Sequence, residues 1–374
     1  MADFEEREEI NEEVRARQEA KLEGLIEILR EAKIRNASDI HLAPASPVLF
    51  RIDGELVPLP DRYFKPYEID SMLDTMLSSN QMKELKERGE LDFAYSITGF
   101  SRIRINVFRQ RNTYAMSLRL LLVDIPDPTE LGLPKPVVDL TNLSKGLVLV
   151  TGSVSTGKST TIAALIEQIA NTYTKSIITV EDPIEYLLKH GRSMVLQREI
   201  GTDTKSYHAA LEAALRQDSD VIFVGELQDM ETIQMAILAA ETGHLVISSL
   251  HTNNTVDSLY RLIEVFPPHQ QQQIRVQLSM VLECIITQQL MPRMNSEGRV
   301  AAFEIMLKNP TIQEAIKGNK IQQIPQLMQR FQGTGMSLMD DAIYELYMRS
   351  RISAETAVKY SYDRSLMEQK VKLF

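Results

Sequence analysis

The sequence is poor in the residues that mark several common protein classes. Its 374 residues include one cysteine, Cys284, and no tryptophan, and aromatic residues make up only 6%. One cysteine cannot form a disulfide framework or a four-cysteine zinc module. No stretch approaches the roughly 18 apolar residues of a membrane-spanning helix, and the start MADFEE is unlike a signal peptide. We therefore expect a cytoplasmic protein.

Basic residues are also too few to balance the acidic ones. Asp and Glu number 51 and Lys and Arg 41, which gives a net charge of -10. This charge disfavours a nucleic-acid coat, although a basic channel inside a ring is compatible with it. We therefore expect no nucleic acid as a partner. With 44% hydrophobic residues, the chain is long enough for two domains with cores of their own.

Changes in residue pattern along the chain predict its domain organisation. Residues 1–33 are expected to form a charged helical leader, either solvated or partner-binding. Residues 34–123 alternate strand-like segments with turns and predict a small α+β domain, and residues 124–136 are a proline-rich linker. From residue 137 to residue 374 strands alternate with helices as in an α/β domain, with C-terminal helices from about residue 310.

The segment LVLVTGSVSTGKSTTIAAL, residues 147–165, predicts a buried strand, a phosphate-binding loop and a helix. Gly152, Gly157, Lys158 and Ser159 match the P-loop spacing G-x-x-x-x-G-K-[ST], in which backbone N–H groups wrap a phosphate. Lys158 would reach the β- and γ-phosphates, and Ser159 would bind Mg²⁺. A plain Gly/Ser turn is the alternative, which the flanking strand and helix disfavour. We predict ATP and Mg²⁺ as cofactors, with nucleotide contacts from Gly152, Ser153, Ser155, Thr156, Gly157, Lys158, Ser159 and Thr160.

Three further strand-like runs end in ionisable side chains. They are VIFVGE, which ends at Glu226, SIITVEDPIEY, which contains Glu181 and Glu185, and HLVISSLHT, which contains His251. Because the carboxyl ends of parallel strands meet at one edge of a sheet, we expect these side chains near the phosphates. Glu226 can hold Mg²⁺ there, directly or through water. A solvated glutamate at a strand end is the plainer alternative.

The order and spacing of these segments resemble the type II/IV secretion ATPase superfamily, and within it the type IV pilus retraction ATPases (PilT-like twitching-motility ATPases). ITVEDPIEY resembles the aspartate box of that family, VGELQDMET its atypical Walker B segment, and AAETGHLVISSLHTNN its histidine box. ASDIHL, FRIDGEL and LGLP also match the family pattern. The resemblance covers about residues 25–365.

This resemblance implies a RecA-like P-loop ATPase domain with a smaller N-terminal, PAS-like α+β domain, in a ring that is usually a homo-hexamer. It implies a motor peripheral to the inner membrane, on its cytoplasmic face, held there through protein partners. An inner-membrane pilus platform protein is the expected partner, and a paralogous retraction ATPase is a further candidate. The chain lacks the extra N-terminal domain and the four-cysteine module of extension ATPases, which favours retraction.

The resemblance also implies roles for individual residues. Glu185 is expected to polarise the attacking water, with Glu181 as the alternative. Arg104 and Arg119 resemble arginines that reach the nucleotide when the domains close, but strand-surface arginines paired with carboxylates would give the same pattern. His251 is expected to sense the γ-phosphate or couple subunits, and a structural histidine is the alternative.

The chain departs from the family pattern at several positions. Ser155 stands where a third P-loop glycine is usual, and it is tolerable only if its backbone avoids positive φ. Arginines are common in the family at the positions of Gln228, Glu212 and Gln313. This chain therefore lacks three positive charges that are usual there. Three hypotheses follow: a pilus-retracting ATPase, an accessory nucleotide-binding paralogue with weak hydrolysis, and a P-loop nucleic-acid translocase, which the acidic charge disfavours.

Overall fold

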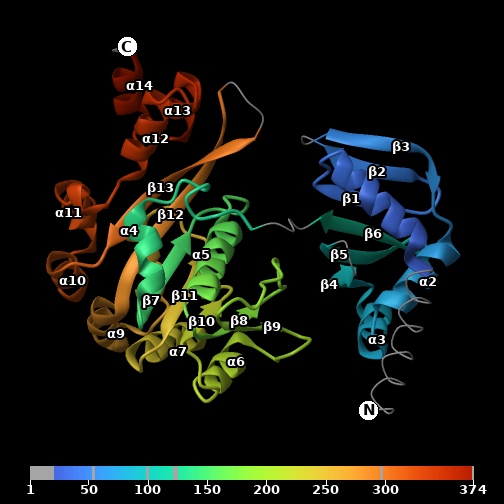
Figure 1. The fold of residues 1–374 in the computed structure, drawn as a ribbon, viewed down its shortest axis with the longest axis horizontal. Helices are drawn as coiled ribbons and strands as arrows, with labels where there is room; N and C mark the ends of the chain where they lie inside the picture. Colours follow the sequence, from blue (N-terminus) through green and yellow to red (C-terminus); the bar gives the residue numbers. More distant parts are fainter. Residues whose placement is uncertain (1–20, 53–54, 98–100, 121–124, 295–297, 373–374) are drawn as a thin grey trace. The chain divides into compact units, whose positions relative to one another are not determined.

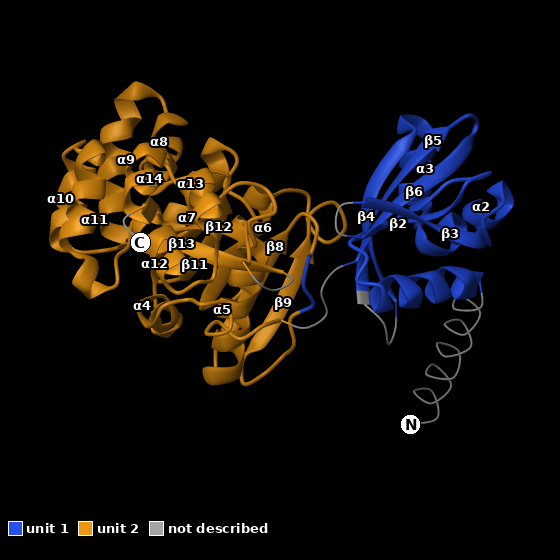
Figure 2. Cartoon of the chain, turned by 90° about the horizontal axis from the view of Figure 1, so that it is seen from above, with its two compact units in different colours: residues 1–123, 185–187 blue, residues 124–184, 188–374 orange. Residues whose placement is uncertain are grey.

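The computed structural model describes residues 21–52, 55–97, 101–120, 125–294 and 298–372. The chain forms two compact units, which Figure 2 shows in blue and orange. Unit 1 comprises residues 1–123 and 185–187, and unit 2 comprises residues 124–184 and 188–374. Of the helices in the described ranges, none is both long and apolar enough to cross a membrane.

Unit 1 is built on a six-stranded antiparallel sheet with the order β3-β2-β1-β6-β5-β4. Its strands are β1 (Asp39–Leu42), β2 (Pro47–Ile52), β3 (Glu55–Tyr63), β4 (Glu90–Ile97), β5 (Ser101–Gln110) and β6 (Thr113–Leu120). Alternate residues such as Phe50, Ile105 and Leu118 are fully buried on one face. This face packs against the helix of residues 21–34, α2 (Pro66–Met76) and α3 (Ser79–Arg88).

The helix of residues 21–34 changes the interpretation of the predicted leader. Leu25 and Leu29 are fully buried in the core of unit 1, because apolar residues recur along one side of the helix. The described part of the leader is therefore a helix of unit 1 that buries one side in the core and exposes the other, charged side. Residues 1–20 of the predicted leader lie outside the described residues.

Unit 2 contains a seven-stranded sheet with the order β13-β12-β7-β11-β10-β8-β9 (Figure 1). Its strands are β7 (Gly146–Thr151), β8 (Ser176–Glu181), β9 (Met194–Glu199), β10 (Val221–Val224), β11 (Leu245–Leu250), β12 (Leu282–Pro292) and β13 (Arg299–Leu307). Neighbouring strands are parallel, except for the antiparallel pair β12 and β13. The central strands are buried on both faces, which explains their unbroken apolar sequences.

Helices cover both faces of this sheet. One face packs against α4 (Lys135–Val138) and α5 (Lys158–Thr172). The other face packs against α6 (Tyr207–Ala214), α7 (Met230–Glu241), α8 (Thr255–Glu264), α9 (Pro268–Val281), α10 (Pro310–Lys317) and α11 (Ile324–Arg330). The C-terminal helices, α12 (Met339–Met348), α13 (Ala354–Tyr360) and α14 (Arg364–Lys372), form a cluster of their own against the β12–β13 hairpin.

The predicted linker is anchored over much of its length. Leu133 is buried in the core beneath α5, and Leu131 packs against the same cluster. The backbone N–H of Leu133 also donates to the Pro128 carbonyl at 3.1 Å, which closes a turn. The part of the predicted linker from Pro128 to Leu133 is therefore ordered against unit 2.

Candidate functional site

The loop between β7 and α5 requires glycine at two positions. Gly152 has a φ of 145° and Gly157 a φ of 88°, values that other residues rarely adopt. A Cβ on Gly152 would lie 2.5 Å from the Gln288 carbonyl oxygen, and one on Gly157 would lie 2.9 Å from Gln288 Nε2. Helix α5 begins directly afterwards, at Lys158, so its first unpaired N–H groups face the loop.

Ser155 adopts a left-handed backbone with a φ of 65°. A serine is tolerated without strain only at negative φ, and this position does not meet that condition; the cost is about 1 kcal/mol. The Ser155 carbonyl accepts a hydrogen bond from Arg299 Nη1 at 3.3 Å, and the Thr156 hydroxyl donates to the Ser153 carbonyl at 2.9 Å. Contacts from outside and within the loop thus hold a conformation that glycine would adopt more easily.

Lys158 is buried and points back into its own loop. Its Nζ donates to the carbonyl oxygens of Gly152 and Ser153, both at 2.8 Å, and lies 3.2 Å from Nδ1 of His251. An ammonium group has three N–H donors, and these partners can use all of them. A phosphate that binds Nζ must therefore displace at least one.

His251 connects this lysine to the carboxylate that follows β10. Because Nδ1 faces an ammonium donor, it acts as the acceptor, and the neutral ring carries its proton on Nε2. Nε2 lies 3.5 Å from Glu226 Oε1. The other carboxylate oxygen, Oε2, accepts a hydrogen bond from Gln228 Nε2 at 2.8 Å. The structure thus brings Lys158, His251 and Glu226, which follow three different strands, into one contact chain.

Glu181 lies at the end of β8 and is only 7% exposed. Its Oε1 accepts hydrogen bonds from the Thr179 hydroxyl at 2.6 Å and from Gln197 Nε2 at 3.0 Å. The carboxylate is therefore held by groups of its own unit.

Tyr207, at the start of α6, joins this edge of the sheet and was not identified from the sequence. Its hydroxyl would lie 2.9 Å from a Cβ on Gly225, so the glycine before Glu226 makes room for it. Burial, together with the nearby charges of Asp182, Glu226 and Glu181, raises the pKa of Tyr207. The carboxylates therefore gather around one edge of the sheet.

The other predicted catalytic residues, Arg104, Arg119 and Glu185, are grouped with unit 1. Arg104 on β5 and Arg119 on β6 face each other in register. Arg119 Nε is 2.8 Å from Asp39 Oδ1, and Arg104 Nε is 4.0 Å from Asp92 Oδ1. This pairing corresponds to the alternative interpretation of the two arginines. Glu185 belongs to the segment of residues 185–187 that is grouped with unit 1.

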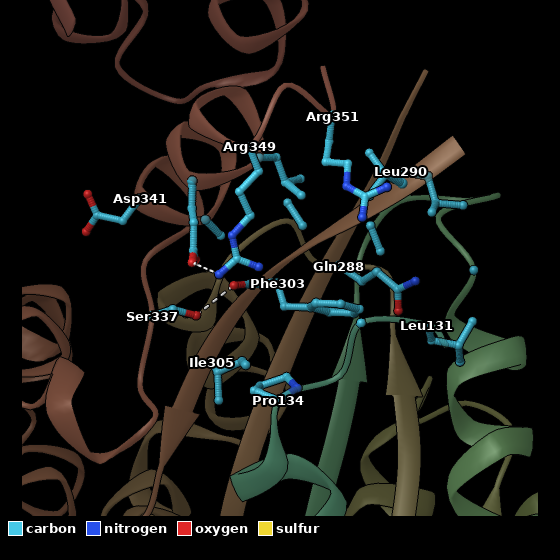
Figure 3. Close-up of a pocket in the computed structure, with 18 of the residues that line it drawn as sticks. Leu131, Pro134, Gln288, Leu290, Phe303, Ile305, Ser337, Asp341, Arg349 and Arg351 are labelled. Atoms are coloured by element: carbon cyan, nitrogen blue, oxygen red, sulfur yellow. Dashed lines mark hydrogen bonds and ion pairs between the residues drawn. The ribbon is translucent and has the colours of Figure 1, made fainter. Parts of the chain in front are cut away.

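A cavity of about 920 Å³ opens beside the first turn of α5 (Figure 3). Gly157 and Thr160 line it together with residues 129–132, Pro134 and residues of the β12–β13 hairpin and of α12. Arg349, directly after α12, makes an ion pair with Glu345, and Figure 3 shows Arg351 near Leu290. The lining mixes apolar side chains with charged ones, Arg293 and Arg299 among them, so the cavity suits a ligand that carries both polar and apolar parts.

The β12 strand supplies a site residue that the sequence interpretation did not identify. Gln288 is 3% exposed, and its Oε1 accepts a hydrogen bond from the Thr161 hydroxyl at 2.7 Å. Its backbone and side chain also limit the space at Gly152 and Gly157. The available signal was the polar pair in IITQQLMP, because glutamine inside an apolar strand needs buried partners.

Comparisons with known proteins agree with this arrangement. Residues 15–372 match the family model described as Type II/IV secretion system protein. The chain is 35% identical over 346 residues to the type IV pilus ATPase PilU of Pseudomonas aeruginosa, covering 92% of this chain and 91% of PilU. It is 36% identical over 335 residues to the type IV pilus retraction ATPase PilT of that organism, covering 89% and 96%. A crystal structure of the pilus retraction motor PilT with bound ADP matches with a TM-score of 0.85 and 44% identity, covering 92% of this chain and 98% of that one.

Proposed function

Because the chain belongs to the type II/IV secretion system protein family, we propose that it hydrolyses ATP to retract or disassemble type IV pili. Its fold is the predicted one, a RecA-like ATPase domain with a smaller N-terminal domain, as the likeness to PilT confirms. The observation that carries the proposal is the contact chain from Lys158 through His251 to Glu226. It joins the P-loop lysine to a carboxylate that follows β10, a strand separated from β7 by β11.

The P-loop would bind the phosphates of ATP through its backbone N–H groups and through Lys158. Nζ of Lys158 would exchange a loop carbonyl or His251 for a phosphate oxygen. Ser159 and Glu226 fit Mg²⁺, because this ion takes oxygen ligands and needs only one or two from the protein beside phosphate and water. When bound, Mg²⁺ would neutralise phosphate charge. The cavity beside Thr160 would receive the nucleoside.

A carboxylate is also needed to polarise the attacking water. Glu181 already accepts hydrogen bonds from Thr179 and Gln197, which favours Glu185 for this role. Arg104 and Arg119 would supply cations for the charge that develops on the γ-phosphate, and His251 would report its presence to Glu226.

We further propose that the chain works as a homo-hexameric ring on the cytoplasmic face of the inner membrane. There it would bind the pilus platform protein, with a paralogous retraction ATPase as a further candidate partner. The likeness to PilT over most of both chains supports this assembly. Light scattering should then show a particle several times the 42.5 kDa chain when an ATP analogue is present. A strict monomer would contradict the ring.

A second candidate function is an accessory paralogue with weak hydrolysis. Gln228, in place of the usual arginine, gives Glu226 a neutral amide as its partner, and the strained Ser155 replaces a P-loop glycine. The likeness to PilU is as extensive as the likeness to PilT. Under this alternative the chain would bind ATP but release phosphate slowly.

Phosphate release by the purified chain tests these functions. Lys158→Ala should abolish hydrolysis and weaken ATP binding, whereas Lys317→Ala, an exposed lysine on α10, serves as the control. Glu185→Gln should bind ATP but not hydrolyse it, and Glu181→Gln should retain more activity. ATP binding without hydrolysis in the wild type would favour the accessory function. Stimulation by DNA would instead support the translocase.

A further inference from the structure

A second connection leads from the P-loop to the C-terminal helices. The Ser153 hydroxyl donates to Asn253 Oδ1 at 2.7 Å. The backbone carbonyl of Asn253 accepts a hydrogen bond from the hydroxyl of Tyr362, which lies between α13 and α14. Asn253 is two residues beyond His251, so one residue joins the P-loop, the histidine loop and the C-terminal helices.

The C-terminal helices hold Tyr362 firmly at its backbone. Asp340 in α12 accepts hydrogen bonds from the backbone N–H groups of Tyr362 at 2.7 Å and Asp363 at 2.9 Å. The three helices pack around buried side chains that include Met339, Ile343 and Met367. Tyr362 itself is 48% exposed, so about half of its surface remains in water. Its hydroxyl is the group that makes a specific contact.

The histidine loop is tied to the same helices by a second group. Glu304 on β13 is 5% exposed. It accepts hydrogen bonds from the backbone N–H of Thr255, at the start of α8, at 2.7 Å and from that of Met339, at the start of α12, at 3.4 Å. The loop of residues 251–255 is therefore fixed to the C-terminal helices at two points, Asn253 and Thr255. A movement of these helices would be transmitted to the loop.

We propose that Tyr362 is a positioning residue for ATP hydrolysis, which acts through Asn253 on His251 and on Ser153 of the P-loop. This inference rests on the proposed ATPase function. The hydroxyl of Tyr362 keeps the histidine loop at the distance from Lys158 and Glu226 that the contact chain requires. A partner or neighbouring subunit that displaces α12–α14 would therefore lower turnover without touching the nucleotide.

Tyr362→Phe tests this role, because it removes only the hydroxyl. The matched control is Tyr347→Phe, since the Tyr347 hydroxyl donates to the Val371 carbonyl at 3.4 Å within the same helices. We expect Tyr362→Phe to lower kcat about fivefold, because the loss of one hydrogen bond typically has an effect of this size. The KM for ATP should change little. Tyr347→Phe should leave kcat unchanged, and the two variants should have similar melting temperatures.

A double-mutant cycle with Ser153→Ala tests the path through Asn253. If the two hydroxyls act on one loop, the double variant should be little slower than either single variant. Equal kcat for Tyr362→Phe and Tyr347→Phe, or effects that simply multiply in the cycle, would overturn the inference. If the wild-type chain does not hydrolyse ATP, that result contradicts the proposed function and not the inference about Tyr362.

Discussion

Arg119 makes an ion pair that competes with its proposed role in hydrolysis. Its Nε lies 2.8 Å from Asp39 Oδ1, and the Ser38 hydroxyl donates to the other oxygen at the same distance. Partial burial opposes ionisation of Asp39, but the hydrogen bonds from Ser38 and Arg119 and the Arg119 charge together lower its pKa. Asp39 is therefore a carboxylate at neutral pH. Arg119 can act on a nucleotide only if it leaves or shares this partner.

The two roles differ in the size and kind of effect that they predict. The Arg119 side chain is 61% exposed, and an exposed ion pair contributes about 0.2–1 kcal/mol to stability. Arg119→Ala should cost no more than this if the arginine is structural. A cation that stabilises developing phosphate charge is worth at least about tenfold in rate, or about 1.4 kcal/mol. Turnover should then fall while ATP affinity changes much less.

Asp39→Asn separates the two roles, because it removes the partner and keeps the cation. If Arg119 acts in hydrolysis, Arg119→Ala should reduce phosphate release at least about tenfold, and Asp39→Asn should retain or exceed wild-type turnover. Melting temperatures would show that both variants are folded. Normal turnover in Arg119→Ala would reject the proposed role of this arginine. An equal loss in both variants would show that the ion pair itself matters. Arg104→Ala with Asp92→Asn repeats the test across the looser 4.0 Å pair.

Three further variants probe the site and its support. Ser155→Gly should raise the free energy of unfolding by up to about 1 kcal/mol in urea titrations, because the left-handed backbone is no longer strained, and a decrease would mean that the side chain is needed. Gln228→Arg should speed phosphate release by placing a cation beside Glu226, and unchanged or slower release would refute that reason for slow turnover. Burial raises the pKa of Glu304, so the folded chain holds this proton more tightly than the unfolded chain, and wild-type stability should fall as pH rises above the ordinary value of 4.5. Glu304→Gln should lack this decline when unfolding is measured near pH 5 and near pH 7, and parallel pH profiles would contradict it.

The nucleotide-binding part of the fold could be predicted because its signals are local. A strand buried on both faces must be apolar throughout, and the next residues must wrap a phosphate with a fixed glycine spacing. Residues 147–150 and the helix from Lys158 therefore appear in the structure as β7 and α5. The same reasoning placed Glu226 and His251 at the ends of β10 and β11. The contacts of His251 with Lys158 and with Glu226 depend on the strand order, which the sequence does not state.

Features that depend on distant pairing could not be predicted in this way. The β12–β13 hairpin follows a polar, glutamine-rich helix, and its place beside β7 depends on a partner strand far earlier in the chain. Gln288 was missed for that reason. The apolar spacing of Leu22, Leu25 and Leu29 indicated a helix with one buried side, but not that the sheet of unit 1 would cover it. A periodic pattern predicts which face of a helix is buried, but it does not predict which element covers that face.

The contact between Tyr362 and Asn253 marks the limit of such reasoning. The two residues are 109 positions apart. Asn253 stands within the histidine-box segment, but the pattern gives it no role of its own, and a tyrosine in a turn is a common surface residue. Only the packing of α12–α14 against the β12–β13 hairpin brings the hydroxyl to the carbonyl, and only the β7–β11 pairing brings Asn253 to Ser153. Since neither arrangement is encoded in a local sequence pattern, the proposed positioning role of Tyr362 could be inferred only from the folded chain, whereas the P-loop could be predicted from the sequence.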